Sequence, residues 1–561
     1  YDVTVNVRTV NGTGVVDPAA IGGSDFVALP STPVVIPAMT MSVDVPITII
    51  NDTVFEGGLP TFETFTLEYV PGTTTQNIMG VNVAVADALG AAGTGRIQDD
   101  EDPPTVWTIR VRTGFPAIGE VIKDAPGVGP MLDATYFLTD NEVVVTGGNE
   151  NDLFIVDFVN GNPIPDYGNG TNGGGVVIDG GNETSGDSLE IVDTDTVTPF
   201  TFTSVVYTST GVDSGTIVIN DGTLTRTITY AELEPVLDTV AAVDRTFAID
   251  SSPSANPGNH SISVSDTGGL TIIDDGGTNA FESVTFANPT TTLLLNAGNG
   301  NNTVTIGALD VGFSAAFTID GEGGDDNINA STTNIAVSIL GGDGEDILTG
   351  GAGIDTIDGE AGDDSIKGGA GNDSLSGGAD DDTILGEAGD DVIDGGTGND
   401  SLFGGADNDS ILGQGGGDMI FGEGGMDTLK GGTGDDTIDG GADNDSILGE
   451  GGADSLSGGD GNDIVDGGAD NDTLSGGAGM DNIVGGDGTD QVAEVAVGAE
   501  DIKLTNSGLM VGGLSDDIFT VEEFILTGGD LSSMIDASEY TLGNVTINGA
   551  GGDDTLNGGF G

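Results

Sequence analysis

Aspartate recurs every nine residues through a long central stretch of the chain, residues 341–493. The stretch holds 17 consecutive copies of one pattern, with Gly at position 1, Asp at position 6 and an aliphatic residue at position 8 of every copy. The position-6 residues are Asp346, Asp355, Asp364, Asp373, Asp382, Asp391, Asp400, Asp409, Asp418, Asp427, Asp436, Asp445, Asp454, Asp463, Asp472, Asp481 and Asp490. Carboxylates and glycine-loop carbonyls are ligands that Ca²⁺ prefers, and a loose loop suits Ca²⁺ better than Mg²⁺. We therefore expect a row of calcium sites.

The elements that hold these aspartates can be read from the other fixed positions. One aliphatic residue between polar neighbours suits a very short strand with a single inward side chain. The six residues between strands form a loop, in which Gly permits a positive φ and close backbone approach. Two nonapeptides then make one coil of 18 residues, and the stretch predicts a rod roughly 40 Å long, with about 4.8 Å between coils.

Stacked coils bring the position-6 carboxylates into register, where they repel one another. Lys367 and Lys430 are the only basic residues of the stretch, so protein cations cannot balance the charge. A hard divalent cation between the coils can.

The pattern resembles the RTX nonapeptide, G-G-x-G-x-D-x-U-x, a calcium-binding β-helix repeat. The resemblance implies a parallel β-roll with Ca²⁺ between successive coils, held by the Asp side chain and backbone carbonyls. The alternative is a flexible Gly/Asp linker. A flexible linker would not require an aliphatic residue at position 8 of every copy, so the pattern favours the β-roll.

Composition limits the partners of the chain. The net charge is −83, from 93 acidic and 10 basic residues, which excludes nucleic acid and anionic membranes as simple electrostatic partners. About 15 filled calcium sites would supply roughly +30. Cysteine is absent, so disulfides cannot stabilise the fold, and no run of 18 apolar residues predicts a membrane span. The chain begins at Tyr1, which suggests a processed product or a fragment.

Residues 1–102 alternate in the manner of an antiparallel β-sandwich. The stretch resembles a Calx-beta (Ig-like) domain through GSDF, IINDTVFEGG, FETFTLEYV and RIQDDED. The resemblance implies calcium binding by Asp25, Asp52, Glu56, Glu63, Asp99, Asp100 and Glu101. The alternative for these acids is a solvated loop.

This sandwich resemblance is incomplete. Asn51 stands where the family often has an acid, Glu101 replaces an Asp, and the family's opening strands have no counterpart before Tyr1. Either the sequence is an excerpt of a longer chain, or a neighbouring molecule donates the missing strands.

Residues 103–331 predict an irregular β-solenoid, because strand-turn-strand phrases recur there and merge with the array. Phrases that start at Leu293, Phe317 and Val337 are 24 and 20 residues apart, which suits successive rungs. The phrase TYAELEPVL, residues 229–237, is helix-like and reads as a cap or a rung decoration. Asp325 and Asp326 fit either an isolated calcium site or a turn.

We place the calcium-binding β-roll at residues 332–493 and further solenoid rungs at residues 494–561. The phrases at residues 524 and 545 are 21 residues apart, and a new nonapeptide opens near the end, with Asp554 at position 6.

We expect no enzymatic activity from these residues. The single histidine, His260, lies in a polar stretch that predicts a solvated side chain rather than a catalytic base. Aromatic residues are 5% of the chain and scattered, which disfavours a glycan-binding module.

The whole sequence therefore predicts an all-β protein: an incomplete Calx-beta-like sandwich followed by a parallel β-helix or β-roll. We expect an extracellular, secreted protein at the cell surface that folds on binding Ca²⁺ and acts as a stalk, filament, surface layer or adhesin shaft. Copies of the chain could be its partners. The alternative is a secretion and folding segment of a larger enzyme or toxin.

Overall fold

In a computed structural model, the backbone of the β-strands is described along the whole chain, whereas side chains are described mainly after residue 152. With their side chains it describes residues 145, 153–158, 176–179, 187–193, 201–209, 214–220, 222, 225–231, 236–249, 259–276, 283–310, 312–495, 503, 508–511, 516–528 and 532–558. The seven acids assigned to the Calx-beta-like segment lie outside the described residues.

Every regular element in the described part of the chain is a β-strand, which confirms the all-β prediction. No helix among the described residues is long and apolar enough to cross a membrane. The chain divides into two compact units, Tyr1–Arg245 with Phe281–Pro289, and Thr246–Ala280 with Thr290–Gly561. The strand β18 (Ala241–Ile249) contains one of the boundaries.

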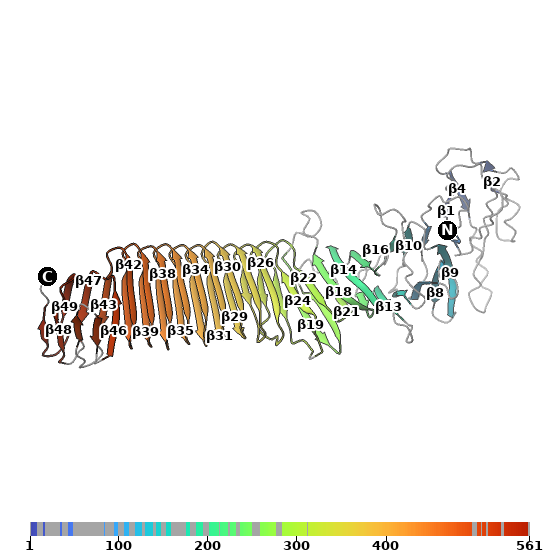
Figure 1. Cartoon of the computed structure of the whole chain (residues 1–561). Helices are drawn as coiled ribbons and strands as arrows, with labels where there is room; N and C mark the ends of the chain where they lie inside the picture. The colour runs from blue at the N-terminus through green and yellow to red at the C-terminus, as the bar shows by residue number, and fades with distance from the viewer. Residues whose placement is uncertain are drawn as a thin grey trace. The chain divides into compact units, whose positions relative to one another are not determined.

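The first unit combines parallel ladders with antiparallel hairpins (Figure 1). Its strands are β1 (Asp2–Val7), β2 (Val15–Val16), β3 (Val34–Val35), β4 (Val43–Thr48), β5 (Val83–Ala84), β6 (Gly95–Gln98), β7 (Val106–Val111), β8 (Ile118–Ala125), β9 (Gly129–Phe137), β10 (Glu142–Thr146), β11 (Leu153–Asp157), β12 (Gly175–Asp179), β13 (Ser188–Val192), β14 (Thr201–Gly211), β15 (Ser214–Asn220), β16 (Thr225–Ala231), β17 (Val236–Asp238) and β21 (Val284–Ala287). Parallel pairing joins β6, β10, β12 and β16 in one sheet, and β7, β11, β13, β17 and β21 in the other.

These parallel ladders bear out the rung-like phrases expected after residue 103, since Val143 pairs with Val176. Strand β6 of the sandwich-like segment also pairs in parallel with β10, while β1 and β4 pair antiparallel. The predicted boundary at residue 102 stays a prediction. The expected helix at residues 229–237 is wrong, because its ends lie in β16 and β17. Alternating β-branched and aromatic residues before Ala231 favour a strand there.

The core of the first unit combines aliphatic and aromatic side chains, and it contains a buried ion pair. Phe158 packs edge-on against Phe202, with ring centroids 4.9 Å apart. The Arg245 guanidinium contacts the Asp238 carboxylate at 2.6 Å, and both side chains are fully buried. Arg245 also donates to the Tyr207 hydroxyl and to the Ala287 carbonyl, so this buried charge is well satisfied.

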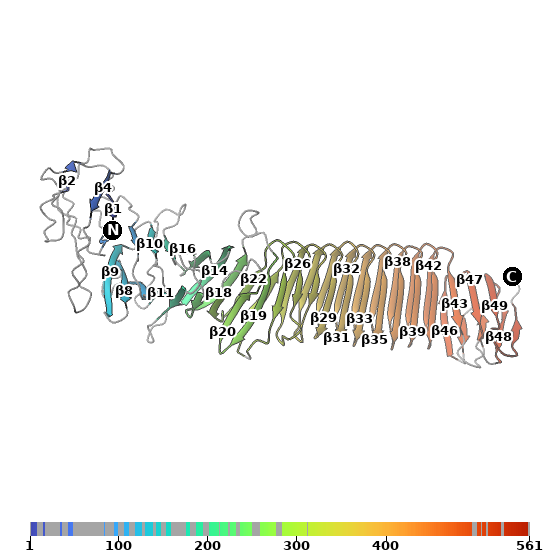
Figure 2. The same ribbon diagram turned by 180° about the vertical axis from the view of Figure 1, so that it is seen from behind.

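The second unit is a stack of two-strand coils (Figure 2). Its strands are β19 (Ser261–Thr267), β20 (Leu270–Asp275), β22 (Thr292–Asn296), β23 (Thr303–Ile306), β24 (Ala316–Asp320), β25 (Asn327–Asn329), β26 (Val337–Asp343), β27 (Ile347–Thr349), β28 (Thr356–Ala361), β29 (Ser365–Ala370), β30 (Ser374–Ala379), β31 (Thr383–Ala388), β32 (Val392–Thr397), β33 (Ser401–Ala406), β34 (Ser410–Gly415), β35 (Met419–Gly424), β36 (Thr428–Thr433), β37 (Thr437–Ala442), β38 (Ser446–Gly451), β39 (Ser455–Asp460), β40 (Ile464–Ala469), β41 (Thr473–Ala478), β42 (Asn482–Asp487), β43 (Gln491–Val495), β44 (Ile502–Thr505), β45 (Gly508–Val511), β46 (Leu514–Phe519), β47 (Glu523–Thr527), β48 (Met534–Glu539), β49 (Asn544–Asn548) and β50 (Thr555–Asn557).

From β26 to β41 each strand pairs in parallel with the strand two places later, 18 residues along the chain, as in Ile357↔Leu375. Even-numbered strands form one sheet and odd-numbered strands the other. The position-8 residues of all copies are buried between the two sheets, at most 2% exposed. The structure therefore confirms the 18-residue coil with one inward side chain per strand.

The less regular rungs around the array also follow the predicted spacings. Leu293 pairs with Phe317, and Phe317 pairs with Val337, 24 and 20 residues apart. Beyond the array, Phe524 pairs with Val545, 21 residues on. The solenoid phrases on both sides of the array are thus rungs of the same parallel kind.

Candidate metal sites along the aspartate columns

The position-6 aspartates form two buried columns, one along each edge of the roll. Column 1 contains Asp346, Asp364, Asp382, Asp400, Asp418, Asp436, Asp454, Asp472 and Asp490, and column 2 contains Asp355, Asp373, Asp391, Asp409, Asp427, Asp445, Asp463 and Asp481. Each of these side chains is at most 3% exposed. The strict 18-residue period places them in register, as the sequence predicts.

One carboxylate oxygen of each aspartate is used within the protein. The Asp346 N–H donates to Oδ1 of Asp364 at 2.8 Å, and the Asp364 N–H donates to Oδ1 of Asp382 at the same distance. The bond repeats in every coil of both columns, down to Asp472 and Asp490 at 3.1 Å. Oδ1 therefore holds the coils in register.

The other oxygen, Oδ2, is buried without a hydrogen-bond partner in every column residue except Asp355. Asp355 differs because its Oδ2 accepts the Gly351 N–H at 2.7 Å. A buried carboxylate oxygen with no partner is costly, since burial removes the water that would otherwise solvate it. Each of these atoms consequently needs a cation or a proton.

The neighbours of Oδ2 are main-chain atoms of the position-1 glycines. A Cβ placed on Gly413 would meet Oδ2 of its own Asp418 and, at 2.6 Å, the carbonyl oxygen of Gly431 in the next coil. The same pair of oxygens flanks Gly359 and most other position-1 glycines of the array. Glycine at position 1 leaves open the space in which a carboxylate and a carbonyl oxygen converge.

Backbone geometry turns the loop toward these oxygens. Most position-2 and most position-4 residues have positive φ, and non-glycine residues adopt it too, with φ of 74° at Glu360 and 78° at Asp443. Such values cost roughly 1–2 kcal/mol outside glycine. The loop shape is therefore imposed by stacking.

Burial raises the pKa of the column carboxyls in the metal-free chain. It raises the pKa of Asp364 and Asp382 to about 7 and that of Asp391 to about 6, while backbone N–H donors oppose the shift. Neighbouring carboxylates of the same column add to the increase. Ionisation of these groups near neutral pH is thus unfavourable without a bound cation.

The lysines of the array do not supply that cation. Lys367 forms a surface ion pair with Glu387 at 2.6 Å, with both side chains close to half-exposed, and Lys430 is exposed. Within the described residues, no group of three Asp, Glu, His or Cys side chains is placed to hold a metal. The donors that converge on each column position are one carboxylate oxygen and main-chain carbonyls. Hard oxygen donors in irregular loops fit Ca²⁺.

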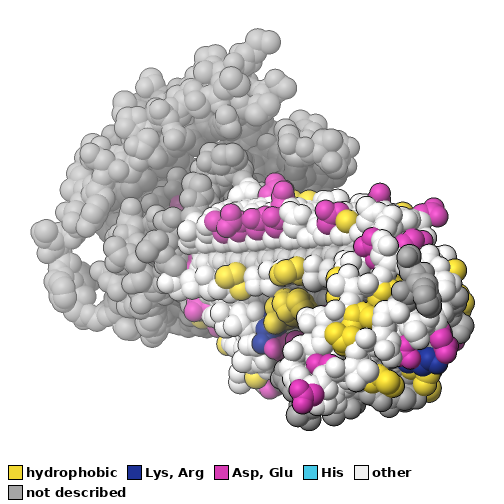
Figure 3. All heavy atoms as spheres, turned by 90° about the vertical axis from the view of Figure 1, so that its left-hand side faces the viewer, with side chains coloured by type: hydrophobic (Ala, Val, Ile, Leu, Met, Phe, Trp, Pro, Cys, Tyr) yellow, Lys and Arg dark blue, Asp and Glu magenta, His cyan; other side chains and the backbone are white. Residues whose placement is uncertain are grey.

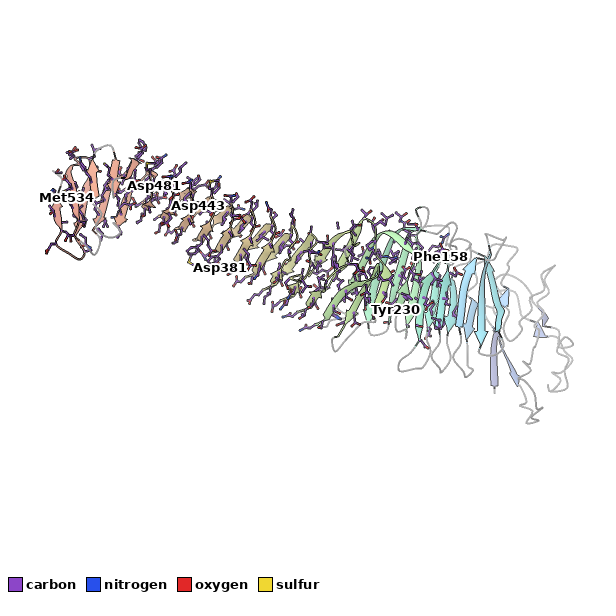
Figure 4. The ribbon with its side chains drawn as sticks, turned by 90° about the horizontal axis from the view of Figure 1, so that it is seen from below. Phe158, Tyr230, Asp381, Asp443, Asp481 and Met534 are labelled. Carbon is purple, nitrogen blue, oxygen red and sulfur yellow. The ribbon has the colours of Figure 1, made fainter. Side chains whose placement is uncertain are left out.

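A second, exposed ladder runs beside each column at position 5. The Asp381 N–H donates to Oδ1 of Asp363 at 3.0 Å, and the Asn399 N–H donates to Oδ1 of Asp381 at 2.7 Å (Figure 4). In this ladder each N–H donates to a side chain of the preceding coil, whereas in the columns each N–H donates to a side chain of the following coil. Acidic side chains also follow one another in a row along the outside of the roll (Figure 3).

Acids outside the array end the columns on the C-terminal side, and the sequence pattern does not reveal them. The Asp481 N–H donates to Oδ1 of Asp516, and the Asp490 N–H donates to Oε2 of Glu522, each at 3.1 Å. Asp516 and Glu522 lie 35 and 32 residues after the aspartates whose N–H groups they accept. The chain between the bonded residues is therefore longer than one 18-residue coil. Asp554 repeats the bond by accepting the Ser533 N–H at 2.9 Å.

His260 is buried, which corrects the expectation of a solvated side chain. It is 2% exposed, and its Nδ1 lies 2.6 Å from Oδ2 of Asp275. His260 directly precedes β19, and pairing of β19 with β20 brings Asp275 beside it.

Comparison with known families agrees with the geometry. A family model described as RTX calcium-binding nonapeptide repeat (4 copies) matches residues 340–375, 359–393, 367–402, 386–420, 394–429, 421–456, 457–492 and 541–561. No curated protein matches the chain. The chain thus contains RTX calcium-binding repeats in a parallel β-rich structure and binds multiple calcium ions. Repeats of this family are typical of secreted proteins that bind calcium outside the cell.

Proposed function

We propose that the chain is an extracellular, calcium-dependent structural protein: a stalk, filament, surface layer or adhesin shaft that folds after secretion. One observation supports the proposal above all others. Sixteen of the 17 column aspartates bury an Oδ2 that has no hydrogen-bond partner, and in most coils a backbone carbonyl of the next coil lies beside it. The stacked coils are complete only when cations fill these positions.

The residues of each coil contribute to folding in different ways. The column carboxylates and position-1 carbonyls would hold calcium, which supplies positive charge between coils. Oδ1 and the position-5 side chains fix the register, and the position-8 side chains form the core. In a calcium-poor cytosol, charge repulsion keeps such a chain from collapsing. Extracellular calcium modules typically bind at about 10⁻⁴–10⁻³ M, so folding follows export.

The mechanical role follows from the repetition of the coil. Each coil pairs with the coil before and the coil after it, so adding coils lengthens the unit without changing its cross-section. The same surface recurs along the array. This arrangement suits a spacer rather than a catalytic centre, and we propose that the segment has no enzymatic activity.

The N-terminal segment and self-association complete the proposal. Residues 1–102 would form a Calx-beta-like domain with its own calcium, and the antiparallel pairing of β1 with β4 supports a sandwich. Copies of the chain would associate into a filament or surface assembly.

Calcium titration of the full chain tests the folding role. Circular dichroism should change from coil to β as calcium is added to chelator-treated protein, and electron microscopy should then show elongated particles. A β-spectrum that is indifferent to chelator would overturn calcium-dependent folding. Discrete globular particles in calcium would overturn the spacer role alone.

A further inference from the structure

Residues 321–329 form a loop and strand that reproduce the column geometry before the matched repeats begin at residue 340. Asp326 is 2% exposed. Its N–H donates to Oδ1 of Asp346 at 2.7 Å, and its own Oδ1 accepts the Asn302 N–H at 2.6 Å. Asp326 therefore extends the hydrogen-bond chain of column 1 by one coil.

The second oxygen of Asp326 is in the same situation as those of the array. Its Oδ2 is buried and has no hydrogen-bond partner. A Cβ on Gly321 would meet both this oxygen and the Gly341 carbonyl oxygen, just as a Cβ on Gly341 would meet Asp346 Oδ2 and the Gly359 carbonyl. A carboxylate and a carbonyl oxygen thus converge here as they do in the repeats.

The loop backbone matches as well. Glu322 and Gly324 have φ of 66° and 114°, and the corresponding residues of a typical repeat, Glu360 and Gly362, have φ of 74° and 128°. The sequence GEGGDDNIN keeps Gly at positions 1 and 4, Asp at position 6 and an aliphatic residue at position 8. This nonapeptide is not part of the uninterrupted nine-residue repeat, because residues 330–340 separate it from the array.

We propose that the Asp326 carboxylate and the Gly341 carbonyl bind a calcium ion, one coil beyond the matched nonapeptides. The proposal relies on calcium binding by the array, and it does not depend on an extracellular or mechanical role. The ion would join the first array coil to the irregular rung before it.

The column stops at the next coil because Asn302 occupies the corresponding place. Its Nδ2 donates to the Gly298 carbonyl at 2.9 Å, and its Oδ1 accepts the His260 N–H at 2.9 Å. The amide is neutral and both of its polar atoms have partners. Asn302 therefore needs no cation, and its Nδ2 already donates to the nearby Gly298 carbonyl.

The test compares two isosteric variants of the full chain. Asp326→Asn keeps an acceptor for the Asn302 N–H but loses the anionic ligand. Asp325→Asn is the matched control, because this exposed neighbour carries the same charge and contacts only Glu345 N–H and Asn301 Nδ2. In calcium, Asp326→Asn should bind about one ion fewer per chain by elemental analysis. It should also lose calcium-dependent protection from hydrogen exchange in residues 297–329, with residues 359–490 unchanged. Asp325→Asn should behave as wild type.

Equal calcium content and equal protection in Asp326→Asn and wild type would overturn the proposal. If Asp326→Asn fails to fold, crystals of the wild-type chain grown in calcium decide the question. Anomalous difference density is expected between Asp326 Oδ2 and the Gly341 carbonyl. Filled array columns without density at this position would also overturn the site.

Discussion

Each column aspartate does two separate jobs with its two oxygens. Oδ1 accepts a backbone N–H from the preceding coil, so its role is register, and an amide oxygen could do it equally well. Oδ2 has no hydrogen-bond partner in 16 of the 17 aspartates, Asp355 being the exception, so its role requires charge. Asn302 illustrates this difference. Its amide oxygen accepts a backbone N–H as Oδ1 of an aspartate does, but the amide carries no charge, and the row of carboxylates stops there.

Replacement of Asp418 by Asn separates these jobs. The variant keeps an acceptor for the Asp400 N–H, which lies 2.9 Å away, but removes the charge at Oδ2. In calcium we expect the free energy of unfolding to fall by roughly 2 kcal/mol, measured by thermal or denaturant unfolding. Asp435→Asn, at the exposed position 5 of the following coil, should change it by less than about 0.5 kcal/mol. Equal effects of the two substitutions would contradict a ligand role for Asp418.

Replacement of Gly359 by Ala tests the space at position 1. The added Cβ would meet Asp364 Oδ2 and, at 2.7 Å, the Gly377 carbonyl, so overpacking should cost about 1–3 kcal/mol and weaken calcium binding. Gly424→Ala is the control, because its Cβ meets nothing closer than 3.8 Å and other copies carry Ala at this position. Calcium titrations monitored by circular dichroism should shift to higher concentration for Gly359→Ala alone. No difference between the variants would count against the shared space.

At the scale of elements, each loop is tied to both neighbouring coils by ladders of opposite direction. The column ladder donates forward, as from Asp364 to Asp382, and the position-5 ladder donates backward, as from Asn399 to Asp381. The position-5 ladder is exposed and needs no cation. Of the two ladders, the columns are the one whose carboxylate oxygens are buried, so we expect them to dominate the response of the array to calcium and to pH.

Acidification should stabilise the calcium-free array. Burial raises the folded pKa of Asp364 and Asp382 to about 7, against about 3.9 in an unfolded chain. A raised folded pKa stabilises fully below about pH 4, and that contribution is lost as pH rises through about 7. In chelator, the β-signal in circular dichroism should therefore grow between about pH 8 and about pH 4. Calcium affinity should fall over the same range, because protons compete for the carboxylates. Loss of β-signal on acidification would contradict this account.

Much of the array follows from local pattern, because each strand, loop and carboxylate repeats at a fixed interval. The rungs at Leu293, Phe317 and Val337 could be predicted for the same reason. The unit around Asp326 is less visible, since its coil has 20 residues instead of 18. Asp516 and Glu522 complete the columns from 35 and 32 residues away, and nothing local in the sequence signals this. The N-terminal calcium ligands stay a prediction.

At the scale of the molecule, the net charge of −83 comprises two populations of carboxylates. Exposed acids such as Asp381 are screened by salt, but the column Oδ2 atoms are buried and little affected by mobile ions. The distinction matters because only the buried population needs a specific ligand.

Monovalent salt should therefore fail to replace calcium. In chelator at neutral pH, about 1 M KCl reduces the screening length to about 3 Å and weakens surface repulsion, yet it supplies no ligand-bound cation to the columns. Circular dichroism of the full chain should stay largely coil-like in KCl and become β on addition of calcium at the same ionic strength. Recovery of the β-spectrum by KCl alone would show that general repulsion, and not a specific site, controls folding.

The coil between Asp326 and Asp346 contains two residues more than the coils of the array, and yet the bond between these aspartates measures 2.7 Å. The additional length lies at residues 330–336, on the opposite edge from column 1, and Phe317 still pairs with Val337 across it. Edge loops of this architecture can thus accept insertions while the stacking continues undisturbed. Foreign peptides grafted at such a bend would be displayed at a defined height on the scaffold.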